Sequence, residues 1–207
     1  MDESVRNAIA RWPNVPAVYG YIGVNRRGDF LLQGHLVTHA RTRGFINRNY
    51  GLDAQGRAFF QNGPQRAYAD LEVTPWVYRL LDDGSLRTHC EHPVNRLIEA
   101  GSTADGEIVL VTEHGPGVLH AQDLDPLAEH LETPQGDLPS AVEALQQGDH
   151  NEVYLNLPAG RPRLQTLDPA ELPRRFGYAL QPEPPPEDSR AAVSSYRPAW
   201  RPAAAAV

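Results

Sequence analysis

Turn-forming residues recur along this chain so closely that they limit the length of any helix or strand. The 207 residues include 17 glycines and 19 prolines, and the two types often stand together, as in Asn62-Gly63-Pro64 and His114-Gly115-Pro116. Proline lacks a backbone N–H and glycine tolerates turn conformations, so such clusters end regular elements. The spacing therefore predicts short β-strands joined by tight turns, with few long helices.

Local patterns indicate which segments are strands and which are helices. The apolar run over residues 17–24 predicts a strand, and the turn Asn25-Arg26-Arg27-Gly28 returns the chain as a hairpin. Residues 40–50 have the apolar spacing of a short helix. Residues 93–98 have it too, with Pro93 suited to a first helical turn.

Two stretches of the chain follow the same order of elements. The first reads GDFLLQGHLVTHARTRGFI and DAQGRAFFQNGPQRAYADLE, and the second reads GSLRTHCEHPVNRLIEA and TADGEIVLVTEHGPGVLHAQDL. In each, a glycine opens a strand, and a histidine (His39 or His92) begins a short helical stretch. Each then has a strand that ends at Gly-Pro. The last strand of each ends on an acidic residue and a leucine, Asp70-Leu71 in the first and Asp123-Leu124 in the second. We interpret this order as an internal repeat.

The expected fold class is α+β, mostly antiparallel β, with two repeated β-rich modules that each carry a short helix. The first module covers residues 12–75 and the second covers residues 76–132. An extension over residues 133–180, with a helix near 139–147 and a strand near 153–157, is expected to pack on the second module. Residues 181–207, rich in Pro and Ala, are expected to form a disordered tail.

Composition places the chain among water-soluble globular proteins. Its 41% hydrophobic and 22% charged content is ordinary, and no apolar run approaches the roughly 18 residues that would span a membrane. The acidic, amphipathic start does not resemble a secretory signal, and the one cysteine, Cys90, cannot form an intramolecular disulfide. We therefore expect a cytoplasmic protein without membrane partners.

Charge is distributed unevenly along the chain, whose net charge is −7. Residues 1–96 carry 12 Arg and 9 acidic residues, residues 97–160 carry no Arg and 12 acidic residues, and residues 161–207 carry 7 Arg and 5 acidic residues. So acidic a middle segment repels phosphate, and no nucleic-acid partner is expected. The basic first part and the acidic middle are expected to lie against each other, within the fold or in a homodimer.

One long stretch, which reads GDFLLQGHLVTH and continues through FINRNYGLDAQGRAFFQNGPQRAYADLEVTPWVYRL, resembles an uncharacterised proteobacterial family, one of the domains of unknown function. FINRNYG and FFQNGPQR are its most distinctive parts. The order of predicted elements is more distantly similar to that of another such family, which has two repeated β-rich modules and a suggested regulatory role. The resemblance covers about residues 12–180 and implies a fold. It carries no catalytic residues.

Amide and guanidinium side chains gather in two neighbouring stretches beside aromatic residues. Such donors suit a carboxylate or the backbone of a partner protein, and the alternative is that the asparagines build turns. The predicted ligand-binding residues are Asn47, Arg48, Asn49, Tyr50, Gln61, Gln65 and Arg66. The ligand is an unknown small molecule or protein, and no cofactor is expected.

The alternative is a metal-dependent hydrolase that uses His39, His89 and His92, because closely spaced imidazoles suit zinc. The competing interpretation is that His39 and His92 bond local backbone. No G-x-S-x-G, Walker or G-x-G-x-x-G motif is present, and the chain has no lysine. No catalytic residue is predicted, and a non-enzymatic, regulatory binding module is the preferred hypothesis.

Overall fold

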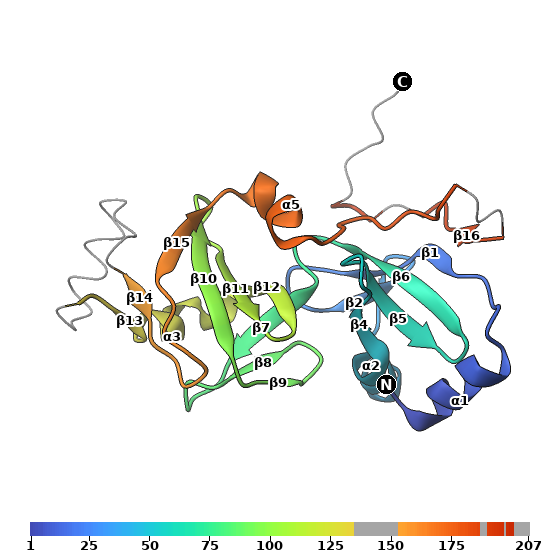
Figure 1. Ribbon diagram of the computed structural model, residues 1–207, viewed down its shortest axis with the longest axis horizontal. Helices are drawn as coiled ribbons and strands as arrows, with labels where there is room; N and C mark the ends of the chain where they lie inside the picture. Colours follow the sequence, from blue (N-terminus) through green and yellow to red (C-terminus); the bar gives the residue numbers. More distant parts are fainter. Residues whose placement is uncertain (135–152, 187–189, 197, 201–207) are drawn as a thin grey trace, which may run out of the picture. The chain divides into compact units, whose positions relative to one another are not determined.

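The structure is a computed structural model that describes residues 1–134, 153–186, 190–196 and 198–200 (Figure 1). The chain divides into two compact units. Unit 1 contains Met1–Pro75 together with Gly177–Val207, and unit 2 contains Trp76–Phe176. The chain thus leaves unit 1 after Pro75 and returns to it at Gly177. Each unit has its own seven-stranded sheet.

The sheet of unit 1 is centred on two neighbouring parallel strands, β1 and β6. Its strands are β1 (Val18–Val24), β2 (Phe30–Leu32), β3 (His35–Leu36), β4 (Tyr50–Leu52), β5 (Ala58–Asn62), β6 (Gln65–Leu71) and β16 (Ala192–Val193). Their order is β3-β2-β1-β6-β5-β4, and β16 pairs with β1 in addition. Unit 1 also contains the helices α1 (Glu3–Arg11) and α2 (Ala40–Asn49).

Short-range side-chain bonds explain why two of these elements form where they do. The Asn25 side-chain oxygen accepts the N–H groups of Arg27 and Asp29, which closes the turn between β1 and β2. His39 stands at the N-cap of α2, where its Nδ1 accepts the N–H of Thr42 at 3.4 Å. The predicted hairpin and the helix beginning at His39 are both confirmed.

The sheet of unit 2 is centred on the parallel strands β7 and β12. Its strands are β7 (Trp76–Leu80), β8 (Leu86–Thr88), β9 (Pro93–Val94), β10 (Leu97–Thr103), β11 (Ile108–Thr112), β12 (Gly115–Leu119) and β15 (Leu164–Leu167), in the order β15-β10-β11-β12-β7-β8-β9. The described residues of unit 2 also form the pair β13 (Leu131–Glu132) and β14 (Tyr154–Leu155), the 3-10 helices η1 (Ala121–Asp123) and η3 (Pro169–Glu171), and the helices α3 (Leu124–Ala128) and α5 (Leu172–Phe176).

The two sheets share one order of strand pairing. Unit 1 reads β3-β2-β1-β6-β5-β4, and six strands of unit 2 read β9-β8-β7-β12-β11-β10. In each, the central pair is parallel and the pairs on either side are antiparallel. Unit 1 places α2 between its third and fourth strands, whereas Asn95 and Arg96 alone separate β9 from β10 in unit 2.

The α+β class is confirmed, and the sheets are mixed. The pairs β1–β6, β1–β16, β7–β12 and β10–β15 are parallel. The helix predicted over residues 93–98 is wrong, because β9 and the start of β10 occupy these residues. The carboxylate of Glu113 accepts the N–H groups of Asn95 and Arg96, at 2.7 and 3.1 Å, and so stabilises the tight link between the strands.

Part of the segment expected as a disordered tail packs on unit 1. Figure 1 shows the described residues of this segment, in red, running alongside β1, with which Ala192–Val193 pair as the parallel strand β16. Ser194 is buried, and Ala191 packs against the cluster of Tyr19, Phe59 and Tyr68. The small and aromatic side chains of this segment find apolar partners that composition alone does not reveal.

The segment expected as an extension is divided between the two units. Its described residues up to Phe176 belong to unit 2, where β14 pairs with β13 and β15 pairs with β10. Residues 177–180 belong to unit 1, where the N–H of Leu71 donates to the Leu180 carbonyl. The helix predicted over residues 139–147 lies outside the described residues. Among the described helices, none has the length and apolar character needed to cross a membrane.

The close approach of β10 to β15 provides a test of how unit 2 is packed. A Cβ at Gly101 would lie 2.5 Å from the Leu167 side chain and 2.8 Å from the Gln165 carbonyl oxygen. We expect Gly101→Ala to lower the free energy of unfolding by about 1–3 kcal/mol, because backbone must shift to make room. Urea denaturation of both proteins measures the difference.

Gly51→Ala is the matched control, because a Cβ at this strand position of unit 1 would meet nothing within 4 Å. Its free energy of unfolding is expected to change by less than about 0.5 kcal/mol. Equal stabilities of the two variants would contradict the packing of β15 on β10.

Candidate functional site

The seven residues predicted to bind a ligand all lie in unit 1. Three come from the end of α2, one begins β4, and three come from the facing ends of β5 and β6. Tyr50 is buried, and its hydroxyl donates to the Pro75 carbonyl at 2.7 Å. Asn47 has a buried Oδ1 with no hydrogen-bond partner in the described part of the chain.

Arg48 and Asn49 hold the start of α1 against the end of α2. The Arg48 Nε donates to Asp2 Oδ1 at 2.9 Å, and Asn49 Oδ1 accepts the Asp2 N–H at 2.8 Å. The hydrogen bond from Arg48 lowers the pKa of the Asp2 carboxyl below its usual value. Asn49 also donates to the Phe45 carbonyl, so both side chains already have structural partners.

Gln61 and Arg66 face each other across the β5–β6 pair. The Arg66 Nε donates to Gln61 Oε1 at 3.2 Å, and Gln61, which is buried, donates to the Gly63 carbonyl. The Arg66 guanidinium also lies 4.0 Å from the centre of the Phe59 ring, within the range of a cation–π interaction. Their polar groups are thus largely engaged within the sheet.

An apolar cavity of about 510 Å³ lies between the sheet of unit 1 and α2. Its lining combines aliphatic and aromatic side chains with two amides and two hydroxyls: Val18, Tyr21, Ile22, Leu32, Thr42, Phe45, Ile46, Phe60, Asn62, Gln65 and Ala67. None of these residues is Asp, Glu, His, Arg or Lys. Gln65 is the predicted ligand-binding residue that the structure brings to this cavity.

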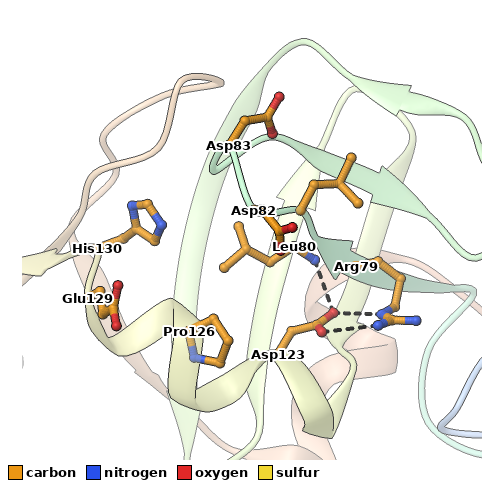
Figure 2. A pocket seen from close by; sticks show the side chains of 9 residues that line it. Arg79, Leu80, Asp82, Asp83, Asp123, Pro126, Glu129 and His130 are labelled. Carbon is orange, nitrogen blue, oxygen red and sulfur yellow. Dashed lines mark hydrogen bonds and ion pairs between the residues drawn. The ribbon is translucent and has the colours of Figure 1, made fainter.

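A second cavity, of about 700 Å³, lies in unit 2, and four of its nine lining residues are acidic: Asp82, Asp83, Asp123 and Glu129. Its most buried carboxylate belongs to Asp123. Figure 2 shows this carboxylate facing the Arg79 guanidinium. Both Asp123 oxygens accept from the Arg79 guanidinium, at 2.6 and 3.1 Å, and the carboxylate also accepts the Leu80 N–H at 3.0 Å. This hydrogen bonding raises the pKa of Arg79. The Arg79–Asp123 ion pair therefore connects η1 to β7, and its two charges largely neutralise each other.

The three histidines of the metal-site hypothesis have separate roles. His39 caps α2 in unit 1, and His89 and His92 belong to unit 2. There the rings of His89, His92 and His114 lie 5.6, 5.9 and 6.0 Å from the Trp76 ring, between centroids. Across the residues that the structure describes, no three His, Cys, Asp or Glu side chains form a group that could hold a metal ion. The metal-dependent hydrolase is therefore not favoured.

Burial keeps His89 and Cys90 uncharged. His89 Nδ1 accepts the Val77 N–H at 3.1 Å, and burial, reinforced by the neighbouring His92, lowers the pKa of His89 to about 3. Burial also raises the pKa of the Cys90 thiol well above its usual value. Because the thiolate is the nucleophilic form, Cys90 behaves as a small buried apolar residue.

Most of the cavity lining escaped the prediction from sequence. Val18, Ile22 and Leu32 belong to predicted strands, whose apolar side chains are expected in any core. Phe45 and Ile46 share one side of the predicted helix. Periodicity marks these residues as inward-facing, and it does not distinguish a filled core from one with a cavity.

Comparison with known proteins identifies a family for the chain. The family model DUF2944, described as "Protein of unknown function (DUF2946)", matches residues 1–183. None of the curated proteins matches the chain.

Two solved structures are distantly similar. A DUF1285 family protein from Silicibacter pomeroyi DSS-3 is 13% identical, over 77% of this chain and 87% of that one, with a TM-score of 0.49. A DUF1285 family protein from Shewanella baltica OS155 is 14% identical, over 53% of this chain and 91% of that one, with a TM-score of 0.43. Both likenesses are too distant to carry an argument about this chain.

The buried His89 predicts acid sensitivity of unit 2. Its pKa is lower in the folded than in the unfolded protein, so the unfolded state binds more protons between about pH 6.5 and pH 3. Stability is therefore complete above that range and falls as the pH drops through it. We expect His89 to account for a loss of about 2 kcal/mol between pH 7 and pH 5.

Urea denaturation of the wild type and of His89→Asn at several pH values measures this loss. Asn retains an acceptor for the Val77 N–H and has no proton to gain, and every other titrating group is common to both proteins. The stability of the variant should depend less on pH, by the amount that His89 contributes. Parallel pH profiles would show that His89 is accessible to protons in the folded state.

Proposed function

The chain belongs to the DUF2944 family of proteins of unknown function, and from this premise we propose that it is a non-enzymatic binding module. Unit 1 is the binding unit, and its ligand is an uncharged, largely apolar small molecule. The observation that carries the proposal is the cavity of about 510 Å³ between the sheet and α2, a volume typical of small-molecule sites. A regulatory role and a cytoplasmic location are parts of the same proposal.

The chemistry of the lining selects the ligand class. A charged ligand would lose its hydration in this cavity without gaining an opposite charge, which is costly. An apolar body gains free energy as aliphatic and aromatic side chains cover it. The amides of Asn62 and Gln65 and the hydroxyls of Tyr21 and Thr42 provide a few polar contacts that can orient a neutral hydrogen-bonding group.

Binding is favoured over catalysis by the residues at hand. General acid–base catalysis needs a side chain that exchanges protons near neutral pH, and the cavity lining contains no carboxylate or imidazole. In unit 2, the Asp123 carboxylate is paired with Arg79 and the Cys90 thiol is held protonated. These groups support the fold.

The predicted ligand-binding residues enter the proposal in two ways. Gln65 contacts the ligand directly as part of the lining. Arg48 and Asn49 position the end of α2, which carries Phe45 and Ile46 into the lining. Tyr50, Gln61 and Arg66 hold the neighbouring elements and are support residues in this proposal, which gives Asn47 no role.

We also propose that units 1 and 2 descend from one duplicated module. The shared strand order, with a parallel pair at the centre of each sheet, supports this proposal together with the repeated sequence pattern. In unit 1, α2 leaves a cavity against the sheet. In unit 2, the link between β9 and β10 has no helix, so the copies have diverged at the binding element.

Binding of a neutral fluorescent probe, N-phenyl-1-naphthylamine, tests the proposed function. We expect its fluorescence to rise saturably with one site per chain and a Kd of about 1–100 μM. Ala67 lines the cavity from β6, so Ala67→Phe should fill it and weaken probe binding at least about tenfold.

Ala121→Phe is the matched control, because it adds the same ring at an exposed position of unit 2 and should leave the Kd unchanged. Both variants are first checked for a cooperative thermal transition. Equal binding by the wild type and a folded Ala67→Phe protein, or no saturable binding by the wild type, would refute the cavity as the ligand site.

A further inference from the structure

Three glycines of the β1–β2 hairpin region create a bare strip on unit 1, which we call the glycine bed: Gly20, Gly23 and Gly34. Each is covered by a residue of the C-terminal segment, a name that we use for the described residues 190–196 and 198–200. Ser194 Cβ lies 3.5 Å from the position of a Cβ at Gly20, and the Trp200 ring lies 3.1 Å from a Cβ at Gly23. A Cβ at Gly34 would overlap the Tyr196 phenol.

The covering side chains stand at alternate positions in the sequence. Ser194, Tyr196, Pro198 and Trp200 stand at alternate positions, and Tyr196, Pro198 and Trp200 line a narrow crevice with the bed glycines Gly20, Gly23 and Gly34. Peptide-binding domains combine a short added strand, such as β16, with pockets for particular side chains, and the strand supplies affinity while the side chains supply specificity.

The C-terminal segment pairs with the sheet over a short stretch, in which Val18 lies beside Ala192 and Tyr19 beside Val193. The N–H of Ala192 donates to the Ala17 carbonyl at 3.2 Å, and the N–H of Ser194 donates to the Tyr19 carbonyl at 2.9 Å. Both residues of β16 are exposed, Val193 by 53%. The indole Nε1 of Trp200 is buried and has no hydrogen-bond partner among the described residues, which weakens its docking.

By contrast, β1 does not need the C-terminal segment to complete its sheet. It pairs with β6 through five residue pairs and with β2 through three, and Ile22 and Val24 are buried in the core. A segment that pairs over two residues, both exposed, opens at a lower free energy than central strands with longer pairing do. The bed can therefore be uncovered while the sheet stays folded.

We propose that the glycine bed is a docking surface for a peptide, occupied reversibly in cis by the C-terminal segment of this chain. The peptide is recognised by a hydroxyl, a tyrosine, a proline and a tryptophan at alternate positions. A partner segment with this pattern competes with the C-terminal segment for the bed. The C-terminal segment thus controls access to an interaction surface of unit 1.

The bed is distinct from the proposed ligand cavity. Tyr21 and Ile22 border both, whereas the three bed glycines are absent from the cavity lining. The docking proposal does not depend on the proposed function, and each can fail without the other.

A fluorescein-labelled peptide of residues 190–202 tests the docking surface by fluorescence anisotropy against the full chain. In wild type the C-terminal segment competes at an effective concentration of about millimolar, so the peptide should bind weakly. In Tyr196→Ala/Trp200→Ala that competition is reduced. We expect the peptide to bind this variant at least about tenfold more tightly than wild type.

Blocking the glycine bed should abolish the tighter peptide binding of the double variant. Gly23 is the last residue but one of β1, and its backbone is not in the left-handed region, so valine can adopt it. A Cβ there would lie 3.1 Å from the Trp200 ring and 3.4 Å, an ordinary contact, from the Asp70 carbonyl oxygen, so Gly23→Val should displace mainly Trp200. Added to the double variant, Gly23→Val should reduce peptide binding to the wild-type level or below. Gly51→Val is the matched control, because its side chain meets open space, and it should retain binding.

Equal binding of the peptide to wild type and to the folded double variant would overturn the proposal. So would binding that survives Gly23→Val.

Hydrogen exchange of the unaltered chain keeps the proposal testable if the double variant fails to fold. We expect the Ser194 amide to exchange at least about tenfold faster than the amides of the β5–β6 pair, such as Tyr68. Exchange of Ser194 at the rate of Tyr68 would show that the C-terminal segment is an integral part of the sheet, which contradicts reversible docking.

Discussion

The parallel pairing of β1 with β6 is the constraint on which unit 1 depends. Ile22 lies beside Ala69 and Val24 beside Leu71, and all four side chains are buried. A tight turn cannot join parallel neighbours, so β2, β3, α2, β4 and β5 must all lie in the connection between them. Within this connection, β2 pairs antiparallel with β1, and β5 pairs antiparallel with β6. Unit 2 has the same arrangement around the parallel strands β7 and β12.

Strand β1 also brings together the two surfaces to which we assign roles. Val18 and Ile22 contribute to the cavity beneath α2, while Gly20 and Gly23 of the same strand receive the C-terminal segment. The register of β1 against β6 shifts between Tyr19 and Ile22, where Gly20 has a φ of +72°. Such an irregularity changes which face a side chain meets, and glycine is the residue that adopts it at least cost.

Local features of the fold were predictable from sequence and non-local ones were not. The β1–β2 turn and the His39 cap were predicted because the side chains that form them are neighbours in the chain. The resemblance to a family of unknown function is confirmed by the match over residues 1–183. The helix expected near His92 failed because Glu113, far along the chain, bonds the backbone of Asn95 and Arg96. For the candidate site, sequence pointed to unit 1 and to Gln65, and it missed the apolar lining.

The sequence by itself determined the β1–β2 turn, the start of α2 at its His39 cap, the α+β class and the absence of motifs for nucleotide chemistry, because these depend on residues close together in the chain. Tertiary structure alone decided the parallel central pairs, the cavity beneath α2 and the place of the C-terminal segment. Each of these depends on which distant surfaces meet. The local sequence around Trp200 does not indicate whether its side chain is solvated or docked. In the structure the ring packs on the backbone of Gly23, which has no side chain to exclude it.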